Sequence, residues 1–225
     1  MALTIKICGL TTPEALDVAL EAGADMVGFV FFPPSPRDLG LEAARILGAR
    51  VRGRAAKVAL TVNAYNHLLR DIIEALKPDV LQLHGKETPE RVAVVRSQFG
   101  MPVMKALPIA ERSDLSPIRL YAKVADRLIF DARPPKEATR PGGLGKPFDW
   151  KLLAGINPGV PVMLSGGLTA DNVADAVAIT RATGVDVSSG VERAPGVKDP
   201  DKIRAFITAA RAAEAPLVLS QADIV

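Results

Sequence analysis

The stretch VMLSGGLTADNVADAVAITRATGVDVSSG, residues 162–190, contains the pattern that decides the fold. It begins with a short apolar run at 162–165, continues with an Ala-rich amphipathic segment at 170–179, and ends with a second apolar run at 185–188. Two short β-branched runs separated by a helical pattern predict a strand–helix–strand unit with parallel strands. Glycine and polar residues follow both runs, so each predicted strand leads into a loop that can carry chemistry.

The same unit repeats along the whole chain. Apolar runs occur at residues 4–8, 26–31, 57–62, 80–84, 103–107, 127–131, 162–165 and 185–188. Helical segments are predicted at 13–22, 41–49, 66–76, 89–99, 170–179 and 199–213. Successive runs begin 22 to 35 residues apart, which is enough for one strand, one helix and two loops. Eight such units predict an α/β chain forming a single-domain (β/α)8 TIM barrel over residues 1–225. The alternative, a doubly wound open sheet, usually has fewer strands and often a G-x-G-x-x-G turn after the first.

The composition of the 225-residue chain excludes several classes of protein. It is 48% hydrophobic and 24% charged, which is typical of a globular domain, and no apolar stretch is long enough to span a bilayer. A single cysteine and two histidines argue against disulfides and against zinc or multi-histidine metal sites. The net charge of +3 favours a small anionic substrate over a nucleic acid or a membrane. The first nine residues lack the pattern of a signal peptide, so we expect a cytoplasmic protein.

The loops after the last two predicted strands indicate a phosphate site. Gly166 and Gly167 follow the seventh strand, and Ser189 and Gly190 follow the eighth. Glycines let the backbone approach an anion, and the N–H groups at the start of a following helix can bind it. A glycine pair alone often marks only a turn. Glycine-rich ends on these two consecutive strands, however, match the usual phosphate site of a TIM barrel.

Two other strand ends offer groups for proton transfer. Asp131 directly follows an apolar run, and Cys8 ends the first strand. A carboxylate there must be either paired or functional, because unpaired burial is costly. Apolar neighbours also favour the protonated form, so we expect Asp131 to be a general acid. Cys8 is equally consistent with a catalytic thiol and with a small core side chain.

The sequence leaves the roles of further polar residues near strand ends open between alternatives. Arg37, in a proline-stiffened loop, could clamp a carboxylate bidentately or lie solvated on the surface. His84 could be a ligand, a base or a side chain held by the backbone. Asp186 would repel a phosphate, so we expect it to order the neighbouring backbone or to accept a substrate hydroxyl. The glycine-rich segment 142–146 is predicted to be a lid; it is not a P-loop, since Pro147 follows its lysine.

Seven segments of the chain match, in order, the motifs of one known enzyme family. They are KICGLT at 6–11, FFPPSPR at 31–37, LQLHG at 81–85, LIFDA at 128–132, residues 142–150, LSGGL at 164–168 and VDVSSGVE at 185–192. Together they cover about residues 5–206 and resemble phosphoribosylanthranilate isomerase. The resemblance implies a barrel enzyme of tryptophan biosynthesis that uses no cofactor and no metal. It implies the conversion of N-(5-phosphoribosyl)anthranilate into 1-(2-carboxyphenylamino)-1-deoxyribulose 5-phosphate by an Amadori rearrangement.

The resemblance also implies roles for individual residues. Asp131 would be the acid that protonates the furanose ring oxygen, and Cys8 the base that takes the proton from C2 of the resulting Schiff base. Arg37 would hold the anthranilate group of the substrate. The phosphate end of the site would comprise Gly166, Gly167, Asp186, Ser189 and Gly190. His84 matches the family's strand-four motif without an assigned role.

The chain departs from the family pattern at one place, and other barrels stay open as alternatives. Leu144 stands where the loop usually reads Gly-Gly-Thr-Gly-Lys, and the tail 216–225 lies outside the resemblance without an assigned role. An indole-glycerol-phosphate synthase would need a Lys/Glu set, for which Lys105 is the obvious start. A ribulose-phosphate epimerase would need metal-binding His and Asp residues at several strand ends. A non-catalytic phosphosugar-binding barrel would need the glycines but neither Cys8 nor Asp131.

Overall fold

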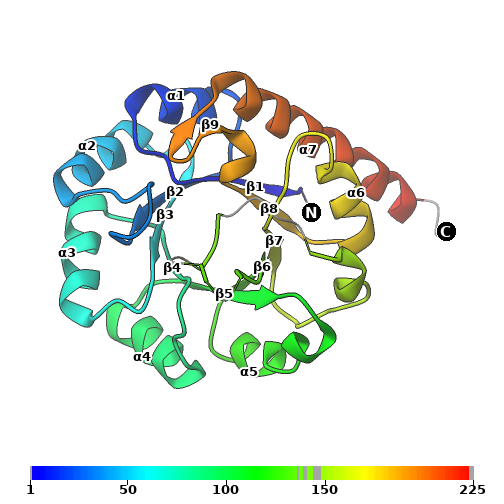
Figure 1. Cartoon of the computed structure of the whole chain (residues 1–225), viewed down its shortest axis with the longest axis horizontal. Helices are drawn as coiled ribbons and strands as arrows, with labels where there is room; N and C mark the ends of the chain where they lie inside the picture. Colours follow the sequence, from blue (N-terminus) through cyan, green and yellow to red (C-terminus); the bar gives the residue numbers. More distant parts are fainter. Residues whose placement is uncertain (1, 136, 139–140, 144–147, 223–225) are drawn as a thin grey trace.

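Eight parallel strands close into a barrel that is surrounded by helices (Figure 1). The computed structural model describes residues 2–135, 137–138, 141–143 and 148–222. The strands are β1 Thr4–Cys8, β2 Met26–Phe31, β3 Ala56–Thr61, β4 Val80–Leu83, β5 Val103–Ile109, β6 Arg127–Ala132, β7 Val162–Leu164 and β8 Gly184–Val187. They are hydrogen-bonded in chain order, and β8 returns to pair with β1. The predicted (β/α)8 TIM barrel is therefore confirmed.

The helices form the outer ring, and the local sequence explains where several of them begin. They are α1 Pro13–Glu21, α2 Leu41–Val51, α3 Asn66–Leu76, α4 Pro89–Phe99, α5 Ile118–Ala122, α6 Val173–Thr180 and α7 Pro200–Ala222, with the 3-10 helices η1 Arg112–Leu115, η2 Trp150–Leu153 and η3 Ser189–Val191. At the starts of α1 and α4 a threonine side chain accepts a backbone N–H, and a proline occupies the first turn. Both features stabilise helix starts, so these two beginnings agree with the prediction.

Several elements differ from the prediction, among them two helices and one hairpin. Helix α6 begins at Val173, because the side chain of Asn172 bonds the backbone of Thr169 and Gly167 and holds residues 167–172 as a turn. Helix α7 continues to Ala222, so it includes most of the tail; residues 223–225 lie outside the described part. A small antiparallel hairpin, β9 Glu192–Ala194 and β10 Val197–Lys198, was not predicted. No described helix, α7 included, is long and apolar enough to span a membrane.

Successive side chains of each strand point alternately to the outside and to the inside of the barrel. On β1, Ile5 and Ile7 pack outward in the large cluster beneath the helices, whereas Cys8 belongs to a small cluster with Val30 and Leu60. A second internal cluster consists of Met26, Val58, Met104, Ala106, Ile129 and Met163. Successive strand residues face opposite sides, so polar residues in phase with these internal side chains enter the barrel.

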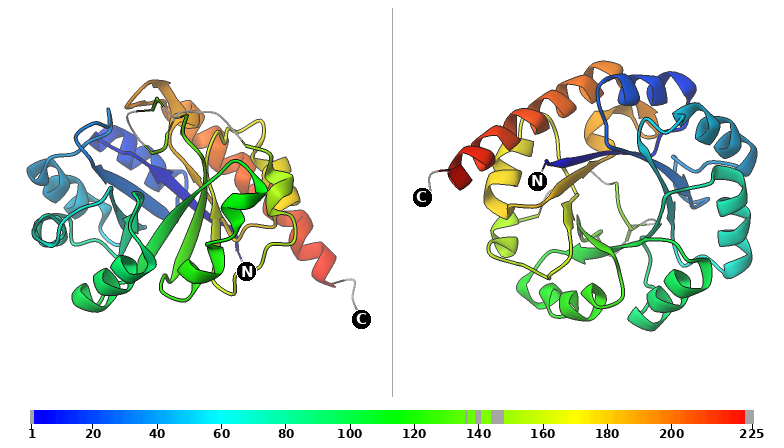
Figure 2. Two further views of the ribbon diagram at one scale, coloured as in Figure 1. Left: turned by 60° about the horizontal axis from the view of Figure 1, so that its bottom comes forward. Right: turned by 180° about the vertical axis from the view of Figure 1, so that it is seen from behind.

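The helical ring is incomplete between β6 and β7. In the described part of this connection the only helix is the single turn η2. A cavity of about 340 Å³ lies beside it, lined by Leu153, Val162 and Ala182 among others. The predicted lid at 142–146 belongs to the same connection; its residues 144–146, including Leu144, lie outside the described residues. Figure 2 (left) shows the β9 hairpin, in orange, at the end of the barrel away from the N-terminus.

The inward face of β2 yields a prediction about stability. Gly28 pairs with Cys8, and a Cβ at this position would lie 2.8 Å from Cys8 Sγ and 3.1 Å from Lys6 Cε. We expect Gly28→Ala to lower the free energy of unfolding by about 1–3 kcal/mol, because overpacking a closed interior forces neighbours to shift. Urea denaturation of the two proteins measures the difference.

Gly40→Ala is the matched control for this prediction. Gly40 is exposed, has a φ of −70°, and would place a Cβ with nothing within 4 Å. Its loss should stay within about 1 kcal/mol, the range for a helix N-cap substitution. Equal effects of the two substitutions would contradict the crowding at Gly28.

Candidate active site

A cavity of about 340 Å³ opens where the carboxyl ends of the strands converge. Its lining contains all the residues that the sequence predicted for the site: Cys8, Arg37, Asp131, Gly166, Gly167, Asp186, Ser189 and Gly190. It also contains His84 and the described lid residues Gly142 and Gly143. Across the described ranges, no three His, Cys, Asp or Glu side chains gather in a way that could hold a metal ion. The cavity therefore unites groups that come from six different strand ends.

Cys8 lies beside a buried ion pair inside the barrel. The Cys8 side chain is buried, and Lys6, two residues earlier on the same strand, is fully buried. Lys6 Nζ lies 2.8 Å from Asp186 Oδ1 on β8. Burial raises the pKa of the Cys8 thiol above its ordinary value, and the positive charge of Lys6 opposes that rise. Asp186 thus pairs with a cation, a contact that the sequence did not predict when it suggested that Asp186 orders the backbone or accepts a substrate hydroxyl.

Asp131 is held at both of its oxygens. Oδ1 accepts the backbone N–H of Ala132 at 2.9 Å, and Oδ2 lies 3.0 Å from His84 Nε2. The other ring nitrogen of His84, Nδ1, lies 3.2 Å from Gln82 Nε2. When Gln82 donates to Nδ1, the proton of the neutral imidazole sits on Nε2 and points to Asp131. His84, whose role the sequence left open, therefore orients the Asp131 carboxyl group.

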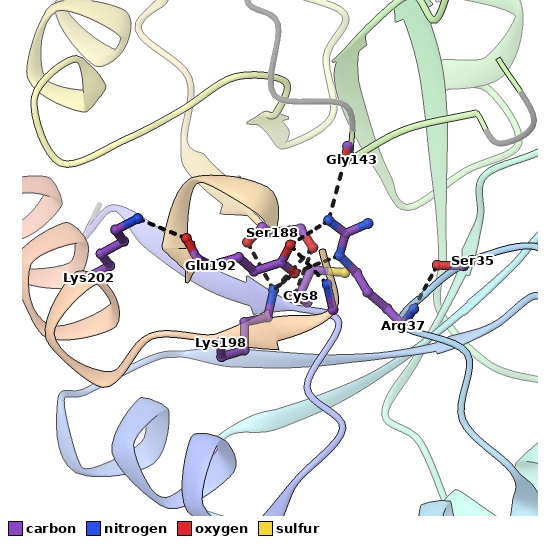
Figure 3. A network of polar contacts seen from close by, with 9 residues as sticks. Cys8, Ser35, Arg37, Gly143, Ser188, Glu192, Lys198 and Lys202 are labelled. Carbon is purple, nitrogen blue, oxygen red and sulfur yellow. Dashed lines mark hydrogen bonds and ion pairs between the residues drawn. The ribbon is translucent and has the colours of Figure 1, made fainter. Parts of the chain in front are cut away.

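Arg37 is a buried residue and not a solvated one, so the surface interpretation was wrong. Only 4% of it is exposed. Its Nε and NH2 groups donate to the two oxygens of Glu192, each at 2.7 Å (Figure 3). Glu192 also accepts from Lys198 Nζ at 2.8 Å. Lys198 donates to the carbonyl oxygen of Ser188 at 2.9 Å, so the network reaches the end of β8.

The two glycine-rich loops border the same cavity, but steric demands alone already require two of their glycines. Gly166 has a φ of +89° and Gly167 a φ of +69°, values that favour glycine. A Cβ at Gly166 would lie 2.5 Å from the amide nitrogen of Ala132, and one at Gly190 would collide with the carbonyl oxygen of Leu168. The backbone N–H groups of Gly166 and Gly167 have no acceptor in the described part of the chain. They remain available as donors to an anion.

Sequence reasoning missed two of the charged residues that organise the site, Glu192 and Lys198, and the ion-pair partner of a third, Lys6. Lys6 had a usable signal, because it precedes Cys8 by two residues on one strand and so shares its inward face. Glu192 lies within the VDVSSGVE motif, but nothing in that motif indicates its partner. Lys198 belongs to the unpredicted hairpin. Lys105, considered as part of a synthase site, is instead held by Glu87 at 2.8 Å and does not line the cavity.

Comparisons with known proteins agree with this geometry. The family model for N-(5'phosphoribosyl)anthranilate (PRA) isomerase matches residues 5–209. The curated isomerase of Nitrobacter winogradskyi is 66% identical over 217 residues, which are 96% of each chain. The crystal structure of the Thermotoga maritima enzyme superimposes with a TM-score of 0.84 at 34% identity, covering 93% of this chain and 99% of that one. A second isomerase structure, in complex with reduced 1-(o-carboxyphenylamino)-1-deoxyribulose 5-phosphate, has a TM-score of 0.81 at 32% identity over the same shares. The chain therefore belongs to the N-(5'-phosphoribosyl)anthranilate isomerase family of tryptophan biosynthesis.

Proposed function

We propose that Asp131 is the general acid and Cys8 the general base of the reaction that this isomerase catalyses. The reaction converts N-(5-phosphoribosyl)anthranilate into 1-(2-carboxyphenylamino)-1-deoxyribulose 5-phosphate by an Amadori rearrangement. The observation that carries the proposal is one cavity lined by both groups and by the two glycine-rich loops. Purified protein should therefore consume the substrate without added metal or nucleotide, which the loss of anthranilate-type fluorescence measures.

The acid step opens the sugar ring. In its protonated form, Asp131 gives its proton to the furanose oxygen, the C1–O bond breaks, and the nitrogen lone pair completes a Schiff base at C1. His84 and the N–H of Ala132 hold the carboxyl group, so it needs no reorientation during transfer. Both contacts also stabilise the carboxylate that remains after the proton has left.

The base step moves a proton from C2. Cys8, as the thiolate, takes this proton, and the C2–H electron pair forms the enolamine that tautomerises to the ketone. A buried thiolate is unfavourable, so a nearby cation is needed for this role. Lys6 supplies it, because its positive charge opposes the effect of burial on the pKa of Cys8. The thiol then returns its proton to solvent while Asp131 regains one, which closes the cycle.

The remaining site residues would hold the two anionic ends of the substrate. Arg37 would bind the carboxylate of the anthranilate ring. The phosphate would lie against the N–H groups of Gly166 and Gly167 and the opposite loop of Ser189 and Gly190. Asp186 acts through Lys6 in this assignment, since its Oδ1 is already paired. All these residues lie on the cavity wall, which supports a single small phosphorylated substrate.

We further propose the setting in which the enzyme works. Residues 1–225 would act as one domain in the cytoplasm, without a nucleic acid or a membrane as partner. A sugar phosphate carries charges that an apolar bilayer excludes, so the enzyme meets its substrate in the compartment where that substrate is made.

Asp131→Asn tests the acid. The amide retains the size of the side chain and an oxygen for His84, but it cannot donate a proton in the way a carboxylic acid does. We expect kcat to fall by about 10²- to 10⁴-fold with the fold intact. Asp126→Asn is the control, because Asp126 lies at the start of β6, pairs with Arg96 and lies outside the cavity lining. A wild-type kcat in Asp131→Asn would remove Asp131 from the acid role.

The pH dependence of Cys8 tests the base. Burial raises the pKa of this thiol, so the thiolate should become populated only above the ordinary value of about 8.5. Iodoacetamide should therefore modify the protein faster as the pH rises through that region, and kcat should rise over the same range. Mass spectrometry should find one alkyl group in the wild type and none in Cys8→Ala. A fully alkylated protein that remains fully active would contradict the assignment.

Ser189→Asp tests the phosphate site without disturbing the sterically required glycines. A carboxylate at this position of the cavity wall should repel phosphate. We expect KM for the substrate and the inhibition constant of inorganic phosphate to rise together, by roughly tenfold or more. Ser97→Asp, which adds the same charge on the exposed side of α4, should change neither. Unchanged inhibition by phosphate in Ser189→Asp would place the anion elsewhere.

A further inference from the structure

A chain of charges lies behind Arg37 and outside the cavity. Arg37 lines the cavity, whereas Glu192 and Lys198 are not among its described lining residues. All three side chains are buried, with at most 5% of each exposed. Any effect of Glu192 or Lys198 on the substrate must therefore pass through Arg37 or through the backbone that they hold.

The contacts of the guanidinium divide its donors into two groups. Nε and NH2 are occupied by Glu192, and NH2 also lies 3.4 Å from the carbonyl oxygen of Gly143. NH1 has no acceptor among the residues that the structure describes, although Arg37 is almost fully buried. Figure 3 shows the guanidinium between Glu192 and Gly143. The contact with Glu192 fixes the guanidinium plane and leaves NH1 as the donor available to a bound group.

Glycine at position 143 is part of this arrangement. A Cβ there would lie 2.6 Å from Arg37 NH1. Any other residue would therefore press on the donor that is still free. The space around NH1 is thus kept open from the side of the β6–β7 connection as well.

The positive charge of Lys198 is needed because the negative charge of Glu192 lies beside the guanidinium that would bind a carboxylate. A carboxylate beside Arg37 would repel an incoming carboxylate and cancel the attraction of the guanidinium. Burial lowers the pKa of Lys198, and the charge of Glu192 and its hydrogen bond oppose that fall. Protonated Lys198 compensates for the carboxylate, because two cations and one anion leave a net charge of +1 on the three residues. Burial works against the charged carboxylate, yet the hydrogen bonds from Arg37 and the charge of Lys198 hold the pKa of Glu192 below its ordinary value. Glu192 is therefore an anion at neutral pH.

We propose that Glu192 and Lys198 are positioning residues for Arg37: Glu192 orients the guanidinium so that NH1 meets the substrate carboxylate, and Lys198 neutralises Glu192. This inference rests on the proposed role of Arg37 as the carboxylate-binding residue. It assigns the selection of an acidic aromatic amine to three residues instead of one. Two of these three never touch the substrate.

Two stable probes separate this role from a general structural one. The first probe is a reduced form of the product, reduced 1-(o-carboxyphenylamino)-1-deoxyribulose 5-phosphate. The second is its counterpart made from aniline, which lacks only the carboxyl group. Calorimetric titration of the full-length protein gives a dissociation constant for each probe. Their ratio measures how strongly the site prefers the carboxylate, and binding of the second probe reports that the barrel and the phosphate site are intact.

We expect Glu192→Gln and Lys198→Met each to lower this preference roughly tenfold, with binding of the carboxyl-free probe unchanged within about twofold. Lys198→Arg retains the charge and should retain most of the preference. In an Arg37→Met background, adding Glu192→Gln should have no further effect on the ratio, because both substitutions remove the same interaction. Glu87→Gln, which breaks a comparably buried ion pair with Lys105, should leave the ratio unchanged.

Each unexpected result would contradict a different claim. If Arg37→Met leaves the preference unchanged, the role of Arg37 in the proposed function is wrong. If Arg37→Met lowers it while Glu192→Gln and Lys198→Met do not, the positioning inference is overturned and Arg37 stands. Equal weakening of both probes by Glu192→Gln would mean a purely structural role and would also overturn the inference. Should Glu192→Gln fail to fold, the contrast between Lys198→Met and Lys198→Arg decides.

Discussion

A charged side chain that is buried near the carboxyl ends of the strands loses its hydration and must form an ion pair there. Lys6 forms an ion pair with Asp186. Arg37 forms one with Glu192, which also pairs with Lys198. The Lys6–Asp186 and Arg37–Glu192 pairs join residues 180 and 155 positions apart in the chain. They can form only after β8 has returned to β1, so closing the barrel and assembling the site are one event. The groups proposed for proton abstraction and carboxylate binding thus lie beside, or take part in, pairs that also favour closure.

The main features of the fold were readable from the sequence because they are periodic. Each strand is a short β-branched run, and each long helix is an amphipathic segment of about the right length, so the order and number of units followed directly. The limits of single elements depended on local bonds that periodicity does not express. Asn172 delays the start of α6 by folding back onto Gly167. The β9 hairpin is too short to produce an alternating pattern.

The site was readable in part, for a related reason. In a parallel barrel the residues that end the strands meet at one rim, so Cys8, Asp131 and the glycines could be placed together by position alone. Partner choice could not be inferred in this way. Which carboxylate binds Arg37, and which imidazole binds Asp131, depends on the register between neighbouring strands and on loops distant in sequence. The residues alone therefore left Arg37 open between a carboxylate-binding and a solvated side chain, and its buried partner Glu192 could not be inferred.

In its described part the β6–β7 connection carries only the 3-10 helix η2, and this affects where the barrel opens locally. Strand β7 has three residues and two registered pairs with β8, whereas β2 and β3 share six. Among the described elements helix α6 packs against β7, and a cavity lined by Val162 of β7 and Leu153 of η2 lies beside it. Local opening is easiest where few backbone bonds and little packing must be lost. The β7–β8 pairing is thus the weakest lateral contact around β7, and we expect the amide hydrogens along it to exchange before those of the β2–β3 pairing.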